Sequence, residues 1–364
     1  HRRRRAGAVT RPLTRGRNPH NSGSKGREVQ YFNTRSGAGY RDVMTPPAKP
    51  TSPCVNYCVV DREAGLCRGC ARSVDEIATW GEATEEFRAA VWAALPARFA
   101  AMGVRDDMEA EVPWSGAPAR VVSLVPSLTE ALAASCPQVL VGCTDWCTHP
   151  AGLDIARVRG TKNPDIEAIA ALEPDLVVAN KEENRAIDVQ RLRDRNIPVW
   201  VTDIVDVPGA LTSMGRLLAR GHGRQQPDWL TEARTLWSKP APATRRRVAV
   251  PIWRDPWMVV GGDSYTNDLL QRLGLDNVYA GRPRYPRVPI DELDRADIDV
   301  VLLPDEPYRF TAEDGPEAFT QTPTQLVSGR LLTWYGPAMV EAWHRLAGQG
   351  GGANGLHQPG VGHR

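Results

Sequence analysis

Short apolar runs alternate with helical patterns along residues 118–205. The runs are RVVSLV (120–125), VLVGCT (139–144), DLVVAN (175–180) and IPVWVT (197–202). Between them, segments such as SLTEALAAS repeat their apolar residues at the spacing of an amphipathic helix. Strands that are apolar on both faces and alternate with helices are typical of a parallel sheet covered by helices on both sides. We therefore predict an α/β lobe over residues 118–205.

The same alternation returns after a long helical stretch. Residues 206–240 have a mainly helical pattern, and apolar runs resume with RRVAVPIW (246–253) and DVVLLP (299–304). We predict a second α/β lobe over residues 245–346, again with a mainly parallel sheet, bridged to the first by the helical segment. Ligands of open α/β sheets bind beyond the carboxyl ends of the strands, and pockets favour domain interfaces. We therefore expect a ligand between the two lobes.

The two ends of the chain differ in composition from its body. Residues 1–49 form a basic and Pro-rich tail, in which residues 1–43 contain eleven Arg or Lys against Glu28 and Asp42. The formal net charge of the whole chain is only +2, so the body is mildly acidic. A segment so poor in apolar residues cannot offset the entropy of ordering by burial. We predict that this tail is disordered and that the Gly-rich end, residues 347–364, is flexible.

Neither a membrane-spanning segment nor a signal peptide is visible. No run of 18 apolar residues occurs, and no apolar stretch follows the N-terminal arginines or Met44. From this we expect a cytoplasmic chain that does not span a membrane. We expect a monomer without a nucleic-acid partner.

Four of the seven cysteines lie close together, with the spacing C-x3-C-x8-C-x2-C. They are Cys54, Cys58, Cys67 and Cys70. Four thiolates in 17 residues, with Gly65 and Gly69 allowing tight turns, indicate a metal site that suits either zinc or an iron–sulfur cluster. A zinc ion with four protein ligands has no open position and would be structural. Unliganded thiols or two disulfides are the alternative.

The segment around these cysteines resembles a small bacterial family. SPCVNYCVVDREAGLCRGCARSVDEIATW is similar to a domain of unknown function whose members are described as predicted Fe–S proteins. The resemblance covers about residues 50–103. It implies a four-cysteine metal-binding domain, followed by a linker at 104–117, and it favours an iron–sulfur cluster over zinc.

A second resemblance covers about residues 118–346. The motifs RVVSLVPSLTEALAA, GTKNPDIEAIAALEPDLVVANKEENR, IWRDPWMVVGGDSYTNDLL and LLTWYGP occur in this order. Together they resemble the cobalamin and iron-siderophore substrate-binding proteins of ABC importers, the helical backbone metal receptors. The resemblance implies two α/β lobes joined by a rigid helix. It also implies a chelate held in the cleft, such as a cobalamin, a haem or a ferric siderophore. As the alternative to a cytoplasmic chain, it implies a periplasmic or membrane-associated one.

The chemistry of the body favours a binding protein over an enzyme. No G-x-S-x-G, H-E-x-x-H or P-loop motif is present. Instead, the loops after the predicted strands carry aromatic and charged residues, which offer a large contact area and polar tips. We predict that the ligand contacts come from Trp146, His149, Lys162, Lys181, Glu182, Asn184, Trp253, Arg254, Trp257, Tyr285 and Trp334.

The resemblance also assigns roles to particular positions. Trp146 and Tyr285 match places where the family sets an aromatic near the ligand, whereas Lys162 and Lys181 stand where cobalamin binders carry aromatics. The two lysines suggest a ligand with anionic groups. The family docks on its permease through an exposed glutamate on each lobe. Glu167, and Asp291 or Glu292, match those positions, although acidic residues at the first turn of a helix are also favoured by its dipole.

Two other interpretations remain open. The chain can be a cytoplasmic corrinoid- or iron-handling protein, in which an iron–sulfur unit acts on the bound chelate. Alternatively, the four-cysteine unit is a structural zinc module fused to a binding domain. The stretch VGCTDWCTHP (141–150) contains further metal-ligand types, but we expect Cys143 to pack in a strand. We expect Trp146 to be the functional residue of that stretch.

Overall fold

The computed structural model describes residues 52–113, 116–222, 226–243 and 245–347. The side chains of residues 220–222 are not described. The predicted basic tail, residues 1–49, and all but the first residue of the predicted flexible end lie outside the described residues.

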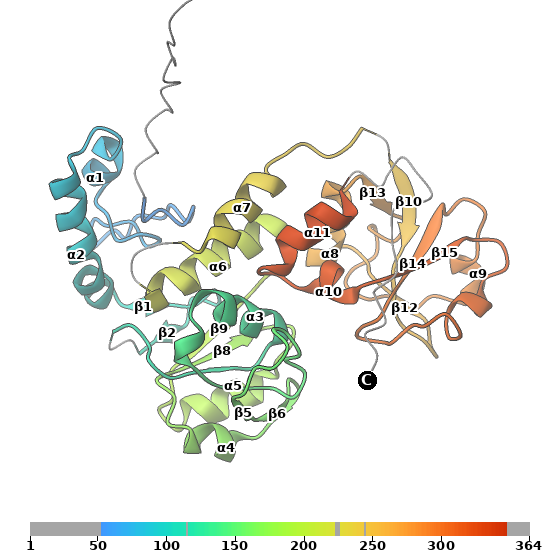
Figure 1. Cartoon of the computed structure of the whole chain (residues 1–364), viewed down its shortest axis with the longest axis horizontal. Helices are drawn as coiled ribbons and strands as arrows, with labels where there is room; N and C mark the ends of the chain where they lie inside the picture. The colour runs from blue at the N-terminus through green and yellow to red at the C-terminus, as the bar shows by residue number, and fades with distance from the viewer. Residues whose placement is uncertain (1–51, 114–115, 223–225, 244, 348–364) are drawn as a thin grey trace, which may run out of the picture. The chain divides into compact units, whose positions relative to one another are not determined.

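The first lobe is a five-stranded parallel sheet with helices on both faces. Its strands, in spatial order, are β5 (Ala156–Arg157), β4 (Leu140–Cys143), β3 (Val121–Ser123), β8 (Leu176–Asn180) and β9 (Val199–Thr202). Its helices are α3 (Pro126–Ser135), η1 (Pro137–Val139), α4 (Ile166–Ala171) and α5 (Ala186–Arg193), and a small hairpin joins β6 (Arg159–Gly160) to β7 (Asn163–Pro164). Figure 1 shows α4 and α5 on the opposite side of the sheet from α3.

The apolar strands of this sheet serve two separate hydrophobic clusters. Val121 and Val178 belong to the cluster that contains α3, whereas Val122 and Val177 belong to the cluster that contains α4 and α5. Successive side chains of a strand point to opposite faces, so a strand that is covered on both faces must be apolar throughout. The continuous apolar runs of the sequence therefore have this physical cause.

The second lobe has a four-stranded parallel sheet, in the order β13-β10-β14-β15. These strands are β13 (Leu275–Asn277), β10 (Arg246–Ala249), β14 (Val300–Pro304) and β15 (Thr324–Val327). An antiparallel pair, β11 (Pro251–Trp253) and β12 (Met258–Val259), lies outside this sheet. The helices are α8 (Tyr265–Arg272), α9 (Ile290–Leu293), η2 (Pro316–Ala318), α10 (Gly329–Thr333) and α11 (Ala338–Leu346). The predicted fold class, two α/β lobes with mainly parallel sheets, is confirmed.

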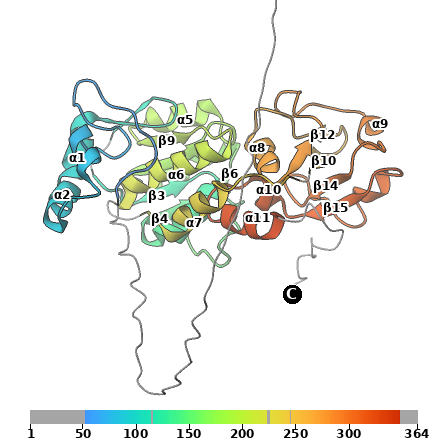
Figure 2. The same cartoon turned by 90° about the horizontal axis from the view of Figure 1, so that it is seen from above.

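Two helices form the segment between the lobes. They are α6 (Val207–His222) and α7 (Asp228–Trp237), which lie side by side in both views (Figures 1 and 2). Met214 of α6 and Leu230 of α7 are fully buried in a core that also includes α3 of the first lobe and α8 of the second. The Trp237 indole donates a hydrogen bond to the Met339 carbonyl, 3.0 Å away, which ties α7 to α11. A helix packed on both lobes in this way is a stiff connection.

The N-terminal unit contains two helices among its described residues. They are α1 (Val74–Thr79) and α2 (Glu85–Met102), which lie side by side in Figure 2. Ser73 and Glu76 form a capping box at the start of α1, and Arg98 of α2 forms an ion pair with Glu76, 2.6 Å away. Trp80 and Phe99 belong to the unit's own small hydrophobic cluster.

Residues 104–117, predicted as a linker, contain a hairpin instead. Strands β1 (Val104–Arg105) and β2 (Glu111–Val112) pair antiparallel, and the turn between them contains two buried carboxylates, Asp106 and Asp107. The Asp107 amide donates to the Val201 carbonyl of β9, 3.1 Å away. The hairpin therefore joins the N-terminal unit to the first lobe's sheet. Among the described residues, no helix is both long and apolar enough to cross a membrane.

Candidate functional site

A loop directly after β8 supplies the first lobe's part of the site. The Asn180 side-chain oxygen accepts hydrogen bonds from the amides of Glu182, 2.9 Å, and Glu183, 3.1 Å. The buried Asn184 side chain donates to the carbonyls of Leu124, 3.2 Å, and Thr161, 2.9 Å. Asn184, predicted to contact the ligand, thus anchors the loop in this structure. The loop holds two glutamates in fixed positions at the carboxyl end of the sheet.

The second lobe places a carboxyl group at the equivalent end of its own sheet. Glu306 follows β14 by two residues and lies within hydrogen-bonding reach of Trp334. Burial, together with the charges of Asp305 and Glu183, raises the pKa of Glu306 to about 7. Glu183 belongs to the first lobe, so this effect acts between the two lobes.

Several other contacts join the lobes at this place. Arg284 Nη1 lies 3.5 Å from the Glu182 carboxylate, and the Tyr285 hydroxyl has its pKa raised by burial and by Glu182. The His149 and Trp334 rings meet edge to face, with their centroids 5.5 Å apart. Glu182, His149, Tyr285 and Trp334, all predicted from the sequence, are therefore brought together. We call this set, with Glu183 and Glu306, the interlobe site.

The three predicted basic residues make contacts with protein groups. Lys162 donates to the Glu182 carbonyl oxygen, and Lys181 pairs with Asp203 at 2.7 Å. Arg254 forms ion pairs with acidic residues of its own lobe, Asp314 and Glu317. The prediction that Lys162 and Lys181 indicate an anionic ligand is thus not supported by their contacts. The side chains that meet between the lobes are largely carboxyl and aromatic.

The predicted tryptophans fall in different environments. Trp146 is 66% exposed beside Gly160, and Trp253 is 46% exposed with its ring edge to face on Tyr308. Trp257, by contrast, is buried between Phe310 and Phe319 in the second lobe's core. Its role as a ligand contact was therefore a wrong expectation, because its motif continues into a strand that packs inward.

The two cysteines of VGCTDWCTHP are both buried. Cys143 ends β4, and Cys147 lies within 3.0 Å of the Thr129 hydroxyl and 3.1 Å of the Thr144 hydroxyl. Arg157 Nη1 donates to the Cys143 sulfur and to the Cys147 carbonyl, each 3.0 Å away. These buried contacts fix the loop to the rest of the first lobe, whereas the side chains of Trp146 and His149 are exposed.

The three predicted docking carboxylates are at least partly accessible. Glu167 is exposed on the first turn of α4 and pairs with Arg195. Asp291 is exposed and Glu292 half-buried on the short helix α9, where Glu292 pairs with Arg282 at 2.7 Å. Each lobe therefore offers an acidic group to a partner, and docking stays a prediction.

The four predicted metal ligands lie in two pairs. Cys54 and Cys58 are within hydrogen-bonding reach of each other, and the charge of Cys67 acts on Cys58. A hydrogen bond from Cys70 lowers the pKa of Cys67 to about 5. A side chain at Gly69 would overlap the Tyr57 carbonyl, so this glycine lets the two segments approach. Among the described residues, no group of three such side chains is gathered as the ligands of one ion.

The donor set nevertheless fits a thiophilic metal. All four thiols are free, and two cations lie close: Arg72 donates to the Cys70 sulfur, 3.4 Å away, and the Arg234 guanidinium acts on Cys54. Four thiolates around a dication carry two negative charges, which these two arginines offset.

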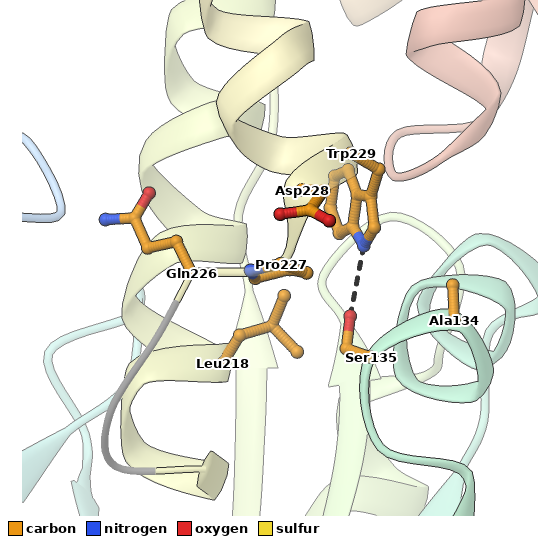
Figure 3. A pocket seen from close by; sticks show the side chains of 7 residues that line it. All are labelled: Ala134, Ser135, Leu218, Gln226, Pro227, Asp228 and Trp229. Atoms are coloured by element: carbon orange, nitrogen blue, oxygen red, sulfur yellow. Dashed lines mark hydrogen bonds between the residues drawn. The ribbon is translucent and has the colours of Figure 1, made fainter. Parts of the chain in front are cut away.

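A separate hollow lies between α3 and the two bridging helices (Figure 3). Its volume is about 420 Å³, and its walls are Ala134, Ser135, Leu218, Gln226, Pro227, Asp228 and Trp229. The Trp229 indole donates to the Ser135 hydroxyl, 3.0 Å away, along one side. None of these residues belongs to the predicted site, and Gln226 directly follows residues that the structure does not describe.

The N-terminal unit and the two-lobed body have different relatives. Residues 52–99 match the family model described as "Protein of unknown function (DUF1289)". The Vitamin B12-binding protein of Vibrio parahaemolyticus is 26% identical over 184 residues, which are 48% of this chain and 66% of that protein. The chain is similar in sequence to vitamin B12-binding proteins. The aligned part spans just under two thirds of that relative's length.

Solved structures share the fold of the body. The periplasmic vitamin B12 binding protein BtuF of Vibrio cholerae covers 63% of this chain and 95% of its own, with a TM-score of 0.51 and 18% identity. The periplasmic heme-binding protein BhuT, solved with two hemes, covers 64% and 98%, with a TM-score of 0.53 and 22% identity. Both resemblances predicted from the sequence motifs, one for each part of the chain, are thus confirmed.

Two residues of the interlobe site, Glu183 and Glu306, were not among those predicted from the sequence. A usable signal was present, because Glu306 follows DVVLLP just as Glu182 and Glu183 follow DLVVAN. Equivalent positions after the central strands of two similar lobes face the same interface.

The pKa of Glu306 is higher in the folded than in the unfolded protein, so the free energy of unfolding depends on pH. A carboxyl with a higher pKa in the folded state takes up a proton on folding, so its contribution falls as pH rises from about 4.5 to about 7. We expect Glu306→Gln to raise the free energy of unfolding by about 1–3 kcal/mol at pH 8 and far less at pH 5. Urea unfolding at both pH values measures this, with the exposed Glu313→Gln as the control. An equal change at both pH values would contradict the assignment.

Proposed function

We propose that this chain is the substrate-binding protein of an ABC-type importer. Its ligand is a metal chelate of the cobalamin, haem or ferric siderophore kind, held between the two lobes without covalent chemistry. The observation that carries the proposal is the interlobe site, where aromatic and carboxyl groups from both lobes meet at the carboxyl ends of the sheets. Relatives named for vitamin B12 and heme binding support the class of ligand.

The residues of the interlobe site have different proposed roles in binding. Trp334 and His149 offer ring faces and edges to a flat chelate, and Tyr285 adds a further ring from the second lobe. Glu182 pairs with Arg284 across the lobes, so closure on a ligand can use a contact that links both halves. Trp146, exposed on the loop after β4, and Trp253, exposed at the end of β11, are proposed to complete the outer wall.

A thermal-shift screen tests the proposed function. We expect cyanocobalamin, haemin or a ferric catecholate siderophore to raise the Tm of the full chain at saturating concentration, because a ligand that binds only the folded state stabilises it. A ligand present at 100 times its Kd adds about 2.7 kcal/mol. Metal-free porphyrin and apo-siderophore are the matched controls. A screen in which none of the three chelates shifts the Tm would remove the proposal's support.

The partners follow from the same proposal. Glu167 and Glu292, one on each lobe, are proposed to dock on the arginines of a membrane permease. The solved relatives are described as periplasmic, which supports an extracytoplasmic site of action over the cytoplasmic one expected from the sequence. Cell fractionation with antibody detection separates the two locations.

The four-cysteine unit is proposed to bind zinc or an iron–sulfur cluster through Cys54, Cys58, Cys67 and Cys70. When bound, such a centre holds its four cysteines together. Arg72 and Arg234 balance its charge, and Gly69 gives the close approach between the two cysteine segments. An absorption spectrum of the purified protein distinguishes the two, since only the cluster absorbs in the visible range.

A further inference from the structure

The segment that contains the first cysteine pair is packed against the bridging helices. Val55 is 1% exposed and lies against Gly215 of α6. The Arg234 guanidinium of α7 donates to the Val55 carbonyl, 3.1 Å away, and the Gln226 amide donates to the Cys54 carbonyl. This segment therefore has metal-ligand sulfurs on one side and the bridging helices on the other.

Tyr57, in the middle of the segment, makes the most specific contact. The Arg216 guanidinium of α6 lies over the Tyr57 ring, 4.3 Å from its centroid. The carbonyl of the same residue, Tyr57, lies against Gly69, between the second pair of cysteines. Tyr57 thus touches both the bridging helix and the turn that carries Cys67 and Cys70.

A series of contacts between charged groups connects Arg216 to the interlobe site. Arg216 Nη1 lies 2.6 Å from the Asp107 carboxylate, and the same carboxylate accepts the Asp203 amide at 3.3 Å. The Asp203 carboxylate pairs with Lys181 Nζ at 2.7 Å. Lys181 is followed directly by Glu182, which pairs with Arg284 of the second lobe.

Metal binding to the cysteines affects the contacts of Arg216, where this series of contacts begins. A metal ion bound by thiols of both segments would join residues 54–58 to residues 67–70 and restrict their relative motion. Val55 and Tyr57 lie within the first of these segments, and both contact α6. A change in their position is therefore a change in the contacts that hold Arg216.

We propose that metal loading of the four-cysteine unit is coupled to chelate binding between the lobes, through Tyr57 and the charged chain Arg216, Asp107, Asp203 and Lys181. The chelate half of this coupling rests on the proposed function. Packed and hydrogen-bonded groups with two arrangements are the physical carriers of such coupling. Coupling of two binding equilibria is reciprocal, so a bound chelate must change metal affinity by the same factor.

Hydrogen exchange of the full chain tests the coupling without any chelate. The protein is stripped of metal under reducing conditions and reloaded with Zn²⁺, with the zinc content measured. We expect loading to slow amide exchange at residues 176–184 and 199–203 at least threefold in the wild type and in Tyr57→Phe, which keeps the ring. In Tyr57→Leu, which removes the ring, these residues should not respond to zinc. Asp203→Asn removes a later contact of the same series. It should abolish the slowing of exchange by zinc at residues 176–184 alone.

Three outcomes overturn the proposal. The protein does not bind Zn²⁺, or zinc does not slow exchange at these residues in the wild type. In the third, zinc slows exchange equally in Tyr57→Phe and Tyr57→Leu. Titration with haemin and cyanocobalamin then measures the coupling itself. We expect the affinity for a bound probe to differ at least threefold between loaded and stripped protein, and an unchanged affinity contradicts the coupling. If neither probe binds while exchange responds, the proposed function fails and the link between Tyr57 and the first lobe stands.

Discussion

Replacing Arg216 with methionine is expected to destabilise the chain by about 3–5 kcal/mol at pH 7, because it leaves a buried carboxylate without its partner. Arg216 is 7% exposed and lies 2.6 Å from Asp107. Burial raises the pKa of Asp107, and the neighbouring Asp106 raises it further, whereas the Arg216 charge lowers it. Chemical denaturation followed by circular dichroism measures the loss.

Two controls separate the ion pair from simple packing. Arg216→Lys keeps the charge and should cost less than Arg216→Met. The double variant Arg216→Met with Asp107→Asn should cost less than the sum of its single changes, because it no longer buries a lone charge. The loss should also shrink as pH falls through the raised pKa of Asp107, because the protonated carboxyl no longer needs a charged partner. A cost under about 1 kcal/mol for Arg216→Met would mean that this pair does not hold the hairpin to α6.

This ion pair illustrates what the sequence could not predict. Asp107 lies in a segment whose polar, Gly-containing composition is typical of a linker, and Arg216 lies in a helix more than 100 residues later. No periodic signal connects them. The hairpin of residues 104–112 is defined by long-range contacts to β9 and α6, which local propensity does not encode.

Trp334→Leu is expected to weaken chelate binding about 30-fold, which corresponds to about 2 kcal/mol. Trp334 is 7% exposed, contacts His149 of the other lobe and lies within reach of Glu306. Large aromatic residues at the centre of an interface carry a large share of the binding energy. Trp334→Phe, which keeps an aromatic ring, should lose no more than about threefold. Unfolding midpoints of both variants show whether the fold is intact, and an equal loss of binding in both would contradict the expectation that an aromatic ring at this position is enough for binding.

The alternation of strands and helices was predictable because it has a direct physical cause. The parallel strands are covered on both faces, so their sequences are continuously apolar, as in DLVVAN and DVVLLP. The position of the interlobe site followed from the same reasoning, since parallel strands deliver their loops to one edge. Glu182, in the loop after β8, was predicted in this way, whereas Tyr285 was placed by the family resemblance and Trp334 follows helix α10 rather than a strand.

The direction of individual side chains was less predictable. Trp253 and Trp257 stand four residues apart in one motif, yet the first is exposed and the second lies in the core. Lys181 follows a strand in the position of a ligand contact, but Asp203, at the end of the next strand, neutralises it. Such pairings depend on which loops are neighbours in space.

A fluorescence titration of the full chain with cyanocobalamin and with haemin tests the central claim most directly. Tryptophan emission reports on the interlobe site, because Trp334 lies within it, Trp146 lies on the loop after β4 and Trp253 is the last residue of β11. We predict saturable quenching by at least one of the two chelates, with an affinity that falls about 30-fold in Trp334→Leu. Quenching that is absent for both chelates, or that is unchanged in Trp334→Leu, would contradict binding between the lobes.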